Sequence, residues 1–135
     1  MQKELRKYWD KTNYNLSCSE TVLRAANEFY NLGLQETCFK MMSAFSGGMF
    51  EGEVCGVVTA GISVISLILT KTNKADSPEM IEAVKEFKQR FKDELKTRDC
   101  TPLKELYEDE VVGCGNLIYA GGKILEEVIA KYKNA

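Results

Sequence analysis

The longest uncharged segment of the chain, Val54 to Thr70, places the strongest constraint on its fold. It is shorter than the ~20 residues that a membrane-spanning helix needs, and longer than an ordinary strand of about 5–6 residues. Its Val and Ile content is compatible with a strand over part of the run. We predict a buried central helix over about residues 54–70, which other apolar faces must then cover.

Helix signals on both sides of this run predict an all-α fold. Ser17 begins a Ser-x-x-Glu capping box. Ser77-Pro78 and Thr101-Pro102 each combine a helix cap with a proline suited to the first turn. The expected helices cover residues 2–11, 17–30, an apolar stripe between 34 and 45, 54–70, a segment that starts at 77, 101–107 and 115–132. With no long linker or repeat, residues 1–135 form one compact helical bundle domain, in which a glycine-rich loop precedes the central helix.

The charge balance removes several classes of function. The chain has 135 residues, a net charge of -2 and a pI near 5.3, so it lacks the excess of positive charge that indicates nucleic-acid binding. Its Lys and Arg residues are scattered among acids, so no membrane-surface role is expected. The segment "MQKELRKYWD" is too polar for a secretory signal, and we expect a cytoplasmic protein.

The sequence contains five cysteines and no histidine. The missing histidine excludes Ser-His-Asp and Cys-His catalysis, histidine-ligated zinc and the C-x-x-C-H motif that attaches haem. No general acid or base stands out, so whether this oxidoreductase-type chain is an enzyme stays open. In a cytoplasmic chain, an odd number of cysteines indicates reduced, metal-bound or redox-active thiols rather than structural disulfides.

Four cysteines fall at predicted helix starts: Cys18, Cys55, Cys100 and Cys114. Free N–H groups and the positive end of the helix dipole stabilise a thiolate there. The thiolate is the species that binds metals and attacks disulfides. The alternative for each is a small buried hydrophobe. We interpret Cys38, in the middle of an apolar stripe, as part of the core.

Four segments, "SCSETVL", "FSGGMFEGEVCGVVTAG", "RDCTPL" and "GCGNLI", resemble the C-GCAxxG-C-C family of redox-active proteins. The resemblance covers nearly the whole chain after residue 14 and implies that Cys18, Cys55, Cys100 and Cys114 are the family's cysteines. Cys38 has no counterpart in that pattern. Val57 and Ala60 depart from it, where alanine and glycine are expected, and both add bulk near the expected site.

The resemblance gives the glycine-rich loop a role beside the sulfur of Cys55. Gly47, Gly48 and Gly52 could adopt positive φ angles and bring backbone amides close to that sulfur, with Gly56 following it. Backbone N–H···S bonds raise the potential of a thiolate-bound cluster. A phosphate cradle is a poorer interpretation, because the G-K-[ST] ending is absent. A flexible connector is the structural alternative.

We therefore expect the four cysteines to converge on one metal or redox site. An iron–sulfur or other thiolate-bound centre, used for electron transfer or redox sensing, is the leading hypothesis. Zinc fits the donors but has no redox chemistry. The family is similar to the non-haem region of split-Soret cytochromes, and no haem is expected here. Metal-free thiol–disulfide exchange and an inert partner-binding bundle are the alternatives. A homodimer and a redox partner protein of unknown identity are also expected.

Two further features have open interpretations. Gly121-Gly122 lies inside the last predicted helix, where each glycine costs about 1 kcal/mol relative to alanine. The pair either allows close packing near Cys114 or breaks the helix. Trp9, in the polar N-terminal segment, is predicted to be a packing anchor.

Overall fold

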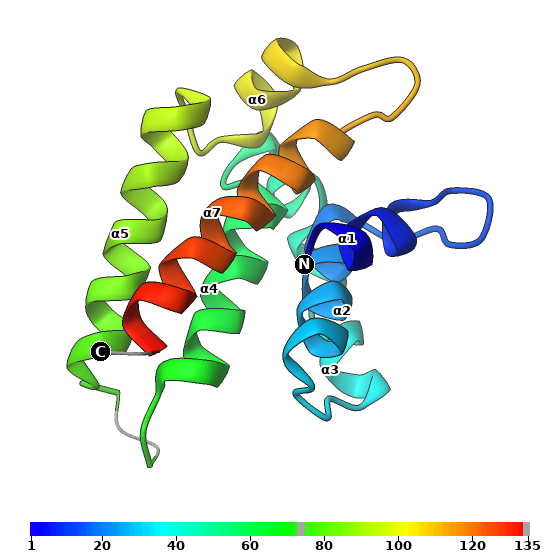
Figure 1. Cartoon of the computed structure of the whole chain (residues 1–135). Helices are drawn as coiled ribbons and strands as arrows, with labels where there is room; N and C mark the ends of the chain where they lie inside the picture. The colour runs from blue at the N-terminus through cyan, green and yellow to red at the C-terminus, as the bar shows by residue number, and fades with distance from the viewer. Residues whose placement is uncertain (73–74, 134–135) are drawn as a thin grey trace.

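A computed structural model describes residues 1–72 and 75–133, and it confirms the all-α fold (Figure 1). The described residues contain two isolated β-bridges and no strand, and none of their helices is long and apolar enough to cross a membrane. The elements are α1 (Gln2–Trp9), α2 (Cys18–Tyr30), α3 (Glu36–Lys40), the 3₁₀ turn η1 (Ser43–Phe45), the loop turn η2 (Gly48–Gly52), α4 (Gly56–Leu69), α5 (Pro78–Leu95), α6 (Cys100–Tyr107) and α7 (Gly115–Lys133).

The uncharged run forms α4, which packs against α2, α5 and α7. Val58, Val64 and Ile65 are fully buried, as a central helix requires. Burial is incomplete near its end, where Leu67 is half-exposed. Val54 and Cys55 precede the helix in an extended conformation. The prediction of a buried central helix is confirmed, and the strand alternative is wrong for this run.

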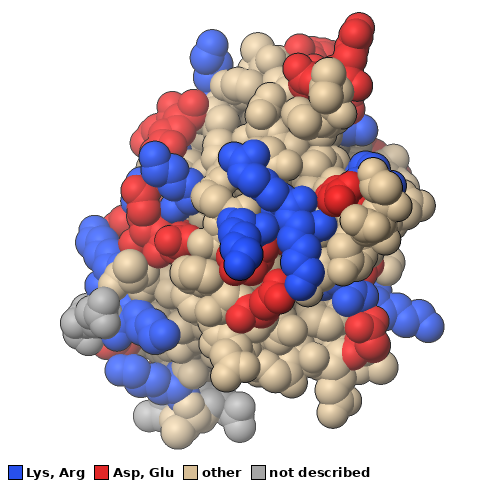
Figure 2. Space-filling view, turned by 45° about the vertical axis from the view of Figure 1, so that its right-hand side comes forward, with Lys and Arg blue, Asp and Glu red and all other residues tan. Residues whose placement is uncertain are grey.

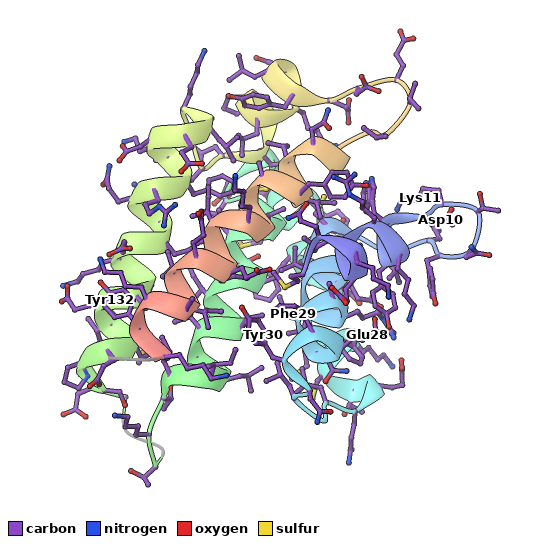
Figure 3. All side chains as sticks on the ribbon, in the orientation of Figure 1. Asp10, Lys11, Glu28, Phe29, Tyr30 and Tyr132 are labelled. Atoms are coloured by element: carbon purple, nitrogen blue, oxygen red, sulfur yellow. The ribbon has the colours of Figure 1, made fainter. Side chains whose placement is uncertain are left out.

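The helix starts follow the capping signals. The Ser17 hydroxyl accepts a hydrogen bond from the Glu20 N–H at 3.2 Å, and Pro78 opens α5. Helix α7 continues through both glycines and ends beside α5, where the Tyr132 hydroxyl donates to Glu86 at 2.9 Å (Figure 3). Helix α6 begins at Cys100, one residue before the predicted start.

The stripe between residues 34 and 45 is the least accurate part of the prediction. It forms the short helix α3 and the turn η1 instead of one amphipathic helix. Phe39 is the buried residue of α3, whereas Cys38 is half-buried and Met41 is exposed. The interpretation of Cys38 as a core residue is therefore wrong, because the helix ends before its apolar face can be enclosed.

The paired glycines of α7 allow close helix packing. A Cβ atom added to Gly121 would lie 2.5 Å from Cγ1 of Val57 and 3.0 Å from Cε2 of Phe91. One added to Gly122 would collide with the side chain of Leu5. Val57 thus fills the space that Gly121 leaves between α4 and α7. The departure from the family pattern at Val57 adds bulk to the core and leaves the cysteine site clear.

We predict that Gly121→Ala destabilises the protein, although alanine favours a helix by about 1 kcal/mol. Overpacking a core costs about 1–3 kcal/mol, which outweighs the helical gain. Urea unfolding measures the change. Val57→Ala in the same chain removes the nearest clash, so the double variant should be less destabilised than the sum of the two single changes. Additive single-variant effects would contradict this packing.

Candidate functional site

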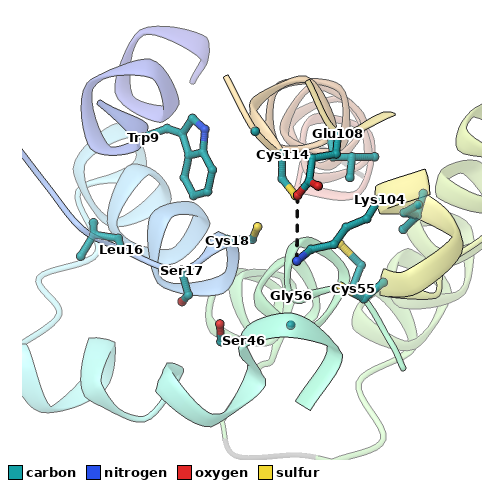
Figure 4. Close-up of a pocket in the computed structure, with 15 residues that line it drawn as sticks. Trp9, Leu16, Ser17, Cys18, Ser46, Cys55, Gly56, Lys104, Glu108 and Cys114 are labelled. Atoms are coloured by element: carbon teal, nitrogen blue, oxygen red, sulfur yellow. Dashed lines mark hydrogen bonds and ion pairs between the residues drawn. The ribbon is translucent and has the colours of Figure 1, made fainter. Parts of the chain in front are cut away.

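One cavity, of about 290 Å³, brings the four predicted cysteines together. It lies where the first residues of α2, α4, α6 and α7 meet, and Cys18, Cys55, Cys100 and Cys114 all line it (Figure 4). Cys38 lies outside it. The rest of the lining comprises Trp9, Leu16, Ser17, Ser46, Gly47, Gly56, Leu103, Lys104, Glu108, Gly113 and Leu117.

A close contact between α2 and α4 brings Cys18 and Cys55 to the same wall. Gly56 makes this contact possible, because a Cβ atom there would lie 3.1 Å from the backbone N of Ser19. The Ser19 hydroxyl is buried and donates to the carbonyl of Met42 at 3.0 Å. Gly56, which follows Cys55, therefore contributes to the site by allowing α2 and α4 to pack closely.

A short antiparallel pairing places Cys55 beside Cys100. The N–H of Cys55 donates to the carbonyl of Arg98 at 2.8 Å, and that of Cys100 donates to the carbonyl of Glu53 at 2.6 Å. Val54 and Asp99 form the bridge between these bonds. We call residues 53–55 and 98–100 the cysteine ladder. It fixes the backbones of two cysteines that are far apart in sequence.

Trp9 holds the turn that carries Cys114. The backbones of Asp109 and Gly113 exchange hydrogen bonds of 2.9 and 2.7 Å, which close the turn. The Trp9 ring N–H donates to the carbonyl of Val112 at 2.7 Å, and its edge packs against Gly115. Trp9 is a packing anchor as predicted, and it is also a wall of the cavity. A lone tryptophan in a polar segment was the only sequence signal for this position.

The glycine-rich loop adopts the expected positive φ angles, but it lies beside a different cysteine. Gly47, Gly48 and Gly52 have φ angles of 59°, 64° and 72°. A Cβ atom on Gly48 would lie 2.8 Å from Cβ of Cys100, and one on Gly52 would collide with Thr101. The amides that hydrogen-bond the Cys55 sulfur belong to Val57 and Val58 of α4. The predicted contact between the loop and that sulfur is wrong, because the loop folds onto the start of α6.

Burial, rather than the helix dipole, dominates the acidity of two of the free thiols. It raises the pKa of Cys55 to about 11, although the Val57 amide opposes the shift. Burial also raises the pKa of Cys100. The prediction that each helix start favours a thiolate is wrong at these positions, because the apolar surroundings disfavour the charged form.

Cys18 and Cys114 form a hydrogen-bonded pair in which the pKa of one thiol is raised and the pKa of the other is lowered. The Cys18 thiol bonded to Cys114 lowers the pKa of Cys114 to about 7. The same contact, together with burial, raises the pKa of Cys18 well above its usual range. Cys114 is therefore the more acidic thiol of the pair, and Cys18 the less acidic one.

Lys104 and Glu108, which the sequence analysis missed, lie beside this pair. The Lys104 ammonium lies 4.0 Å from a Glu108 carboxylate oxygen, and the Cys114 thiol donates to the same oxygen at 3.9 Å (Figure 4). The charge of Lys104 opposes the rise in the pKa of Cys100 and helps to lower the pKa of Cys114, whereas the Glu108 carboxylate acts in the opposite direction on both. The sequence contains a signal for these residues: Cys100 and Lys104 are one turn apart on α6, and Glu108 follows four residues later, directly after the helix ends.

The donor set that the cavity offers is four thiols without imidazole. Among residues 1–72 and 75–133, no group of three or more His, Cys, Asp or Glu side chains is close enough to hold a single metal ion. A tetrahedral ion with metal–sulfur bonds of about 2.3 Å requires its sulfurs to be closely gathered. If the cavity held an iron–sulfur cluster, Cys18, Cys55, Cys100 and Cys114 would be its ligands, and the cluster would supply one-electron chemistry. Four thiols without imidazole match its usual ligands.

The fold and the site define a helical protein with four cysteines around one cavity. The chain belongs to the family described as "Putative redox-active protein (C_GCAxxG_C_C)", whose pattern matches residues 16–128. No curated protein and no solved structure matches the chain. The predicted family is confirmed.

We predict that, in the reduced metal-free protein, Cys114 is alkylated by iodoacetamide with a midpoint near its pKa of about 7. The rate rises with pH through that value because the thiolate is the nucleophile. Cys55 should stay unreactive until far higher pH. Mass spectrometry of the digested protein follows each thiol.

The Cys18→Ala variant tests the cause of this shift. Loss of the Cys18 hydrogen bond should raise the Cys114 midpoint, whereas Cys38→Ala should leave it unchanged. An unchanged midpoint in Cys18→Ala, or alkylation of Cys55 before Cys114, would contradict the assignment.

Proposed function

We propose that the cavity holds an iron–sulfur centre ligated by Cys18, Cys55, Cys100 and Cys114 and used for electron transfer or redox sensing. The observation that carries this proposal is the convergence of four thiols from four helix starts on one cavity, with the fifth thiol outside it. The redox-active description of the family supports the same chemistry.

The residues around the thiols suit a redox centre. Leu103, Leu117 and the Trp9 ring give the cavity apolar walls, which limit water and lower the local dielectric. The Val57 and Val58 amides point at the Cys55 sulfur, and N–H···S bonds of this kind raise a cluster's reduction potential. When bound, the cluster supplies one-electron chemistry that the side chains lack.

Lys104 places a positive charge beside the thiols, and the Glu108 carboxylate, 4.0 Å from it, offsets part of that charge. Its ammonium acts on Cys100 and Cys114, and four thiolates in one cavity would otherwise repel one another. Zinc would satisfy the same donors but supplies no electron transfer. Iron–sulfur chemistry therefore agrees better with the family description.

We predict that protein purified without oxygen contains iron and acid-labile sulfide and absorbs visible light. Cys55→Ser should lose both components, because it removes a ligand. Cys38→Ser is the matched control and should retain them, since Cys38 lies outside the cavity. A wild-type protein free of iron and sulfide, or equal loss in both variants, would refute the proposal.

A second function, thiol–disulfide exchange, is favoured by the contact between Cys18 and Cys114. Cys114 has the lowered pKa, so its thiolate is the group that would attack a disulfide of a partner protein. This step forms a mixed disulfide and releases one partner thiolate. The Cys18 sulfur, deprotonated as it attacks Cys114, then forms the internal disulfide and releases the second. The protein loses two electrons, and the partner disulfide gains them.

We predict that oxidised glutathione converts the reduced metal-free protein to a form with a Cys18–Cys114 disulfide, located by peptide mapping. Cys18→Ala should instead stop at a glutathione adduct on Cys114, because the resolving thiol is absent. Cys55→Ala is the control and should still form the internal bond. Oxidation that joins other pairs, or none, would contradict this second function.

A further inference from the structure

A second hollow, of about 450 Å³, lies between α4 and α5 on the other side of the cysteine ladder. Val54 and Ile62 provide its accessible apolar surface, and the fully buried Val58 also lines it. Its remaining lining residues are Thr59, Lys88, Lys92, Thr97, Arg98 and Asp99. We call this feature the α4–α5 groove. It combines an apolar surface with three cationic side chains.

The charges of the groove are unbalanced. Lys88 and Lys92 are one turn apart on α5 and repel each other, an arrangement that costs a helix a few tenths of a kcal/mol. Neither they nor Arg98 take part in the ion pairs found among the described residues, and Asp99 is the one carboxylate in the lining. On the face in Figure 2, by comparison, acidic side chains border the central group of Lys and Arg side chains. The groove therefore has a local excess of positive charge in a chain of net charge -2.

The cysteine ladder separates the groove from the redox cavity. Val54 and Asp99, which form the ladder's bridge, line the groove. The next residues along each segment, Cys55 and Cys100, line the cavity. A molecule in the groove would thus lie one residue away from two of the four thiols, across backbone that is hydrogen-bonded at 2.6 and 2.8 Å.

We propose that the α4–α5 groove is the docking surface for an acidic segment of the protein that exchanges electrons with the cavity. Carboxylates of that segment would pair with Lys88, Lys92 and Arg98, and an apolar residue would cover Val54 and Ile62, which are both half-buried. Complementary charge of this kind raises the association rate of two proteins and fixes how they are aligned in the complex. The role of the partner rests on the proposed redox function, whereas binding of an acidic segment can be tested without it.

The test is a titration of isotope-labelled protein with a short glutamate-rich peptide that carries two leucines, followed by amide chemical shifts. We expect shifts to concentrate in residues 54–62 and 92–99. The variant with Lys88→Gln, Lys92→Gln and Arg98→Gln should bind at least about tenfold more weakly, because rim charges control such contacts. Raising the salt concentration should weaken the wild type in the same direction.

A matched variant controls for net charge. Lys3→Gln, Lys40→Gln and Lys123→Gln remove three exposed cations outside the groove, and this protein should bind as the wild type does. Arg98→Gln leaves the backbone carbonyl that accepts from Cys55 in place. Circular dichroism of both triple variants confirms that the helices persist.

Three results of the binding experiments would overturn the docking surface. They are equal loss of binding in the two triple variants, shifts centred away from the groove, and inorganic phosphate binding as tightly as the peptide, which indicates a small-anion site. Self-association that only the groove variant abolishes would assign the surface to a second copy and overturn it as well. Iron and sulfide content is measured on the same samples, so a missing cluster with intact peptide binding identifies failure of the redox function alone.

Discussion

The burial of α4 is the constraint on which the rest of the structure depends. An uncharged helix must be covered, and α2, α5 and α7 cover it. Small residues allow this enclosure: Gly61 accepts the ring of Phe87, and Gly121 accepts Val57. Because α4 is held in this way, its first turn has a defined position. The starts of α2, α6 and α7 gather around that turn and form the cavity.

Much of this arrangement was predictable from local sequence signals. Ser17 and Ser77-Pro78 marked helix starts, and the uncharged run marked the central helix. These signals act within a few residues, where capping and periodicity determine the backbone. The prediction was inaccurate for the stripe from Leu34 to Phe45, because the periodicity of apolar residues does not show whether other elements will cover the apolar face. Met41 belongs to this stripe and is nevertheless exposed to solvent.

The candidate site was only partly predictable, because its chemistry depends on contacts between distant segments. The positions of Cys18 and Cys114 at helix starts followed from the sequence, but their mutual hydrogen bond required the fold. The expectation of easily ionised thiols neglected burial, which outweighs the helix dipole at Cys55. Lys104 and Glu108 could not be assigned to the site from the sequence, because charged residues at one-turn spacing are usually solvent-exposed and only the fold places these two beside the cavity.

The cysteine ladder also has a consequence for the order of events after synthesis. It joins residues 53–55 to residues 98–100, and such long-range contacts form late because the intervening chain must first be ordered. Cys114 lies still further along the chain. The cavity with all four thiols is therefore complete only after the segment that carries Cys114 has been synthesised and has folded onto the three earlier segments.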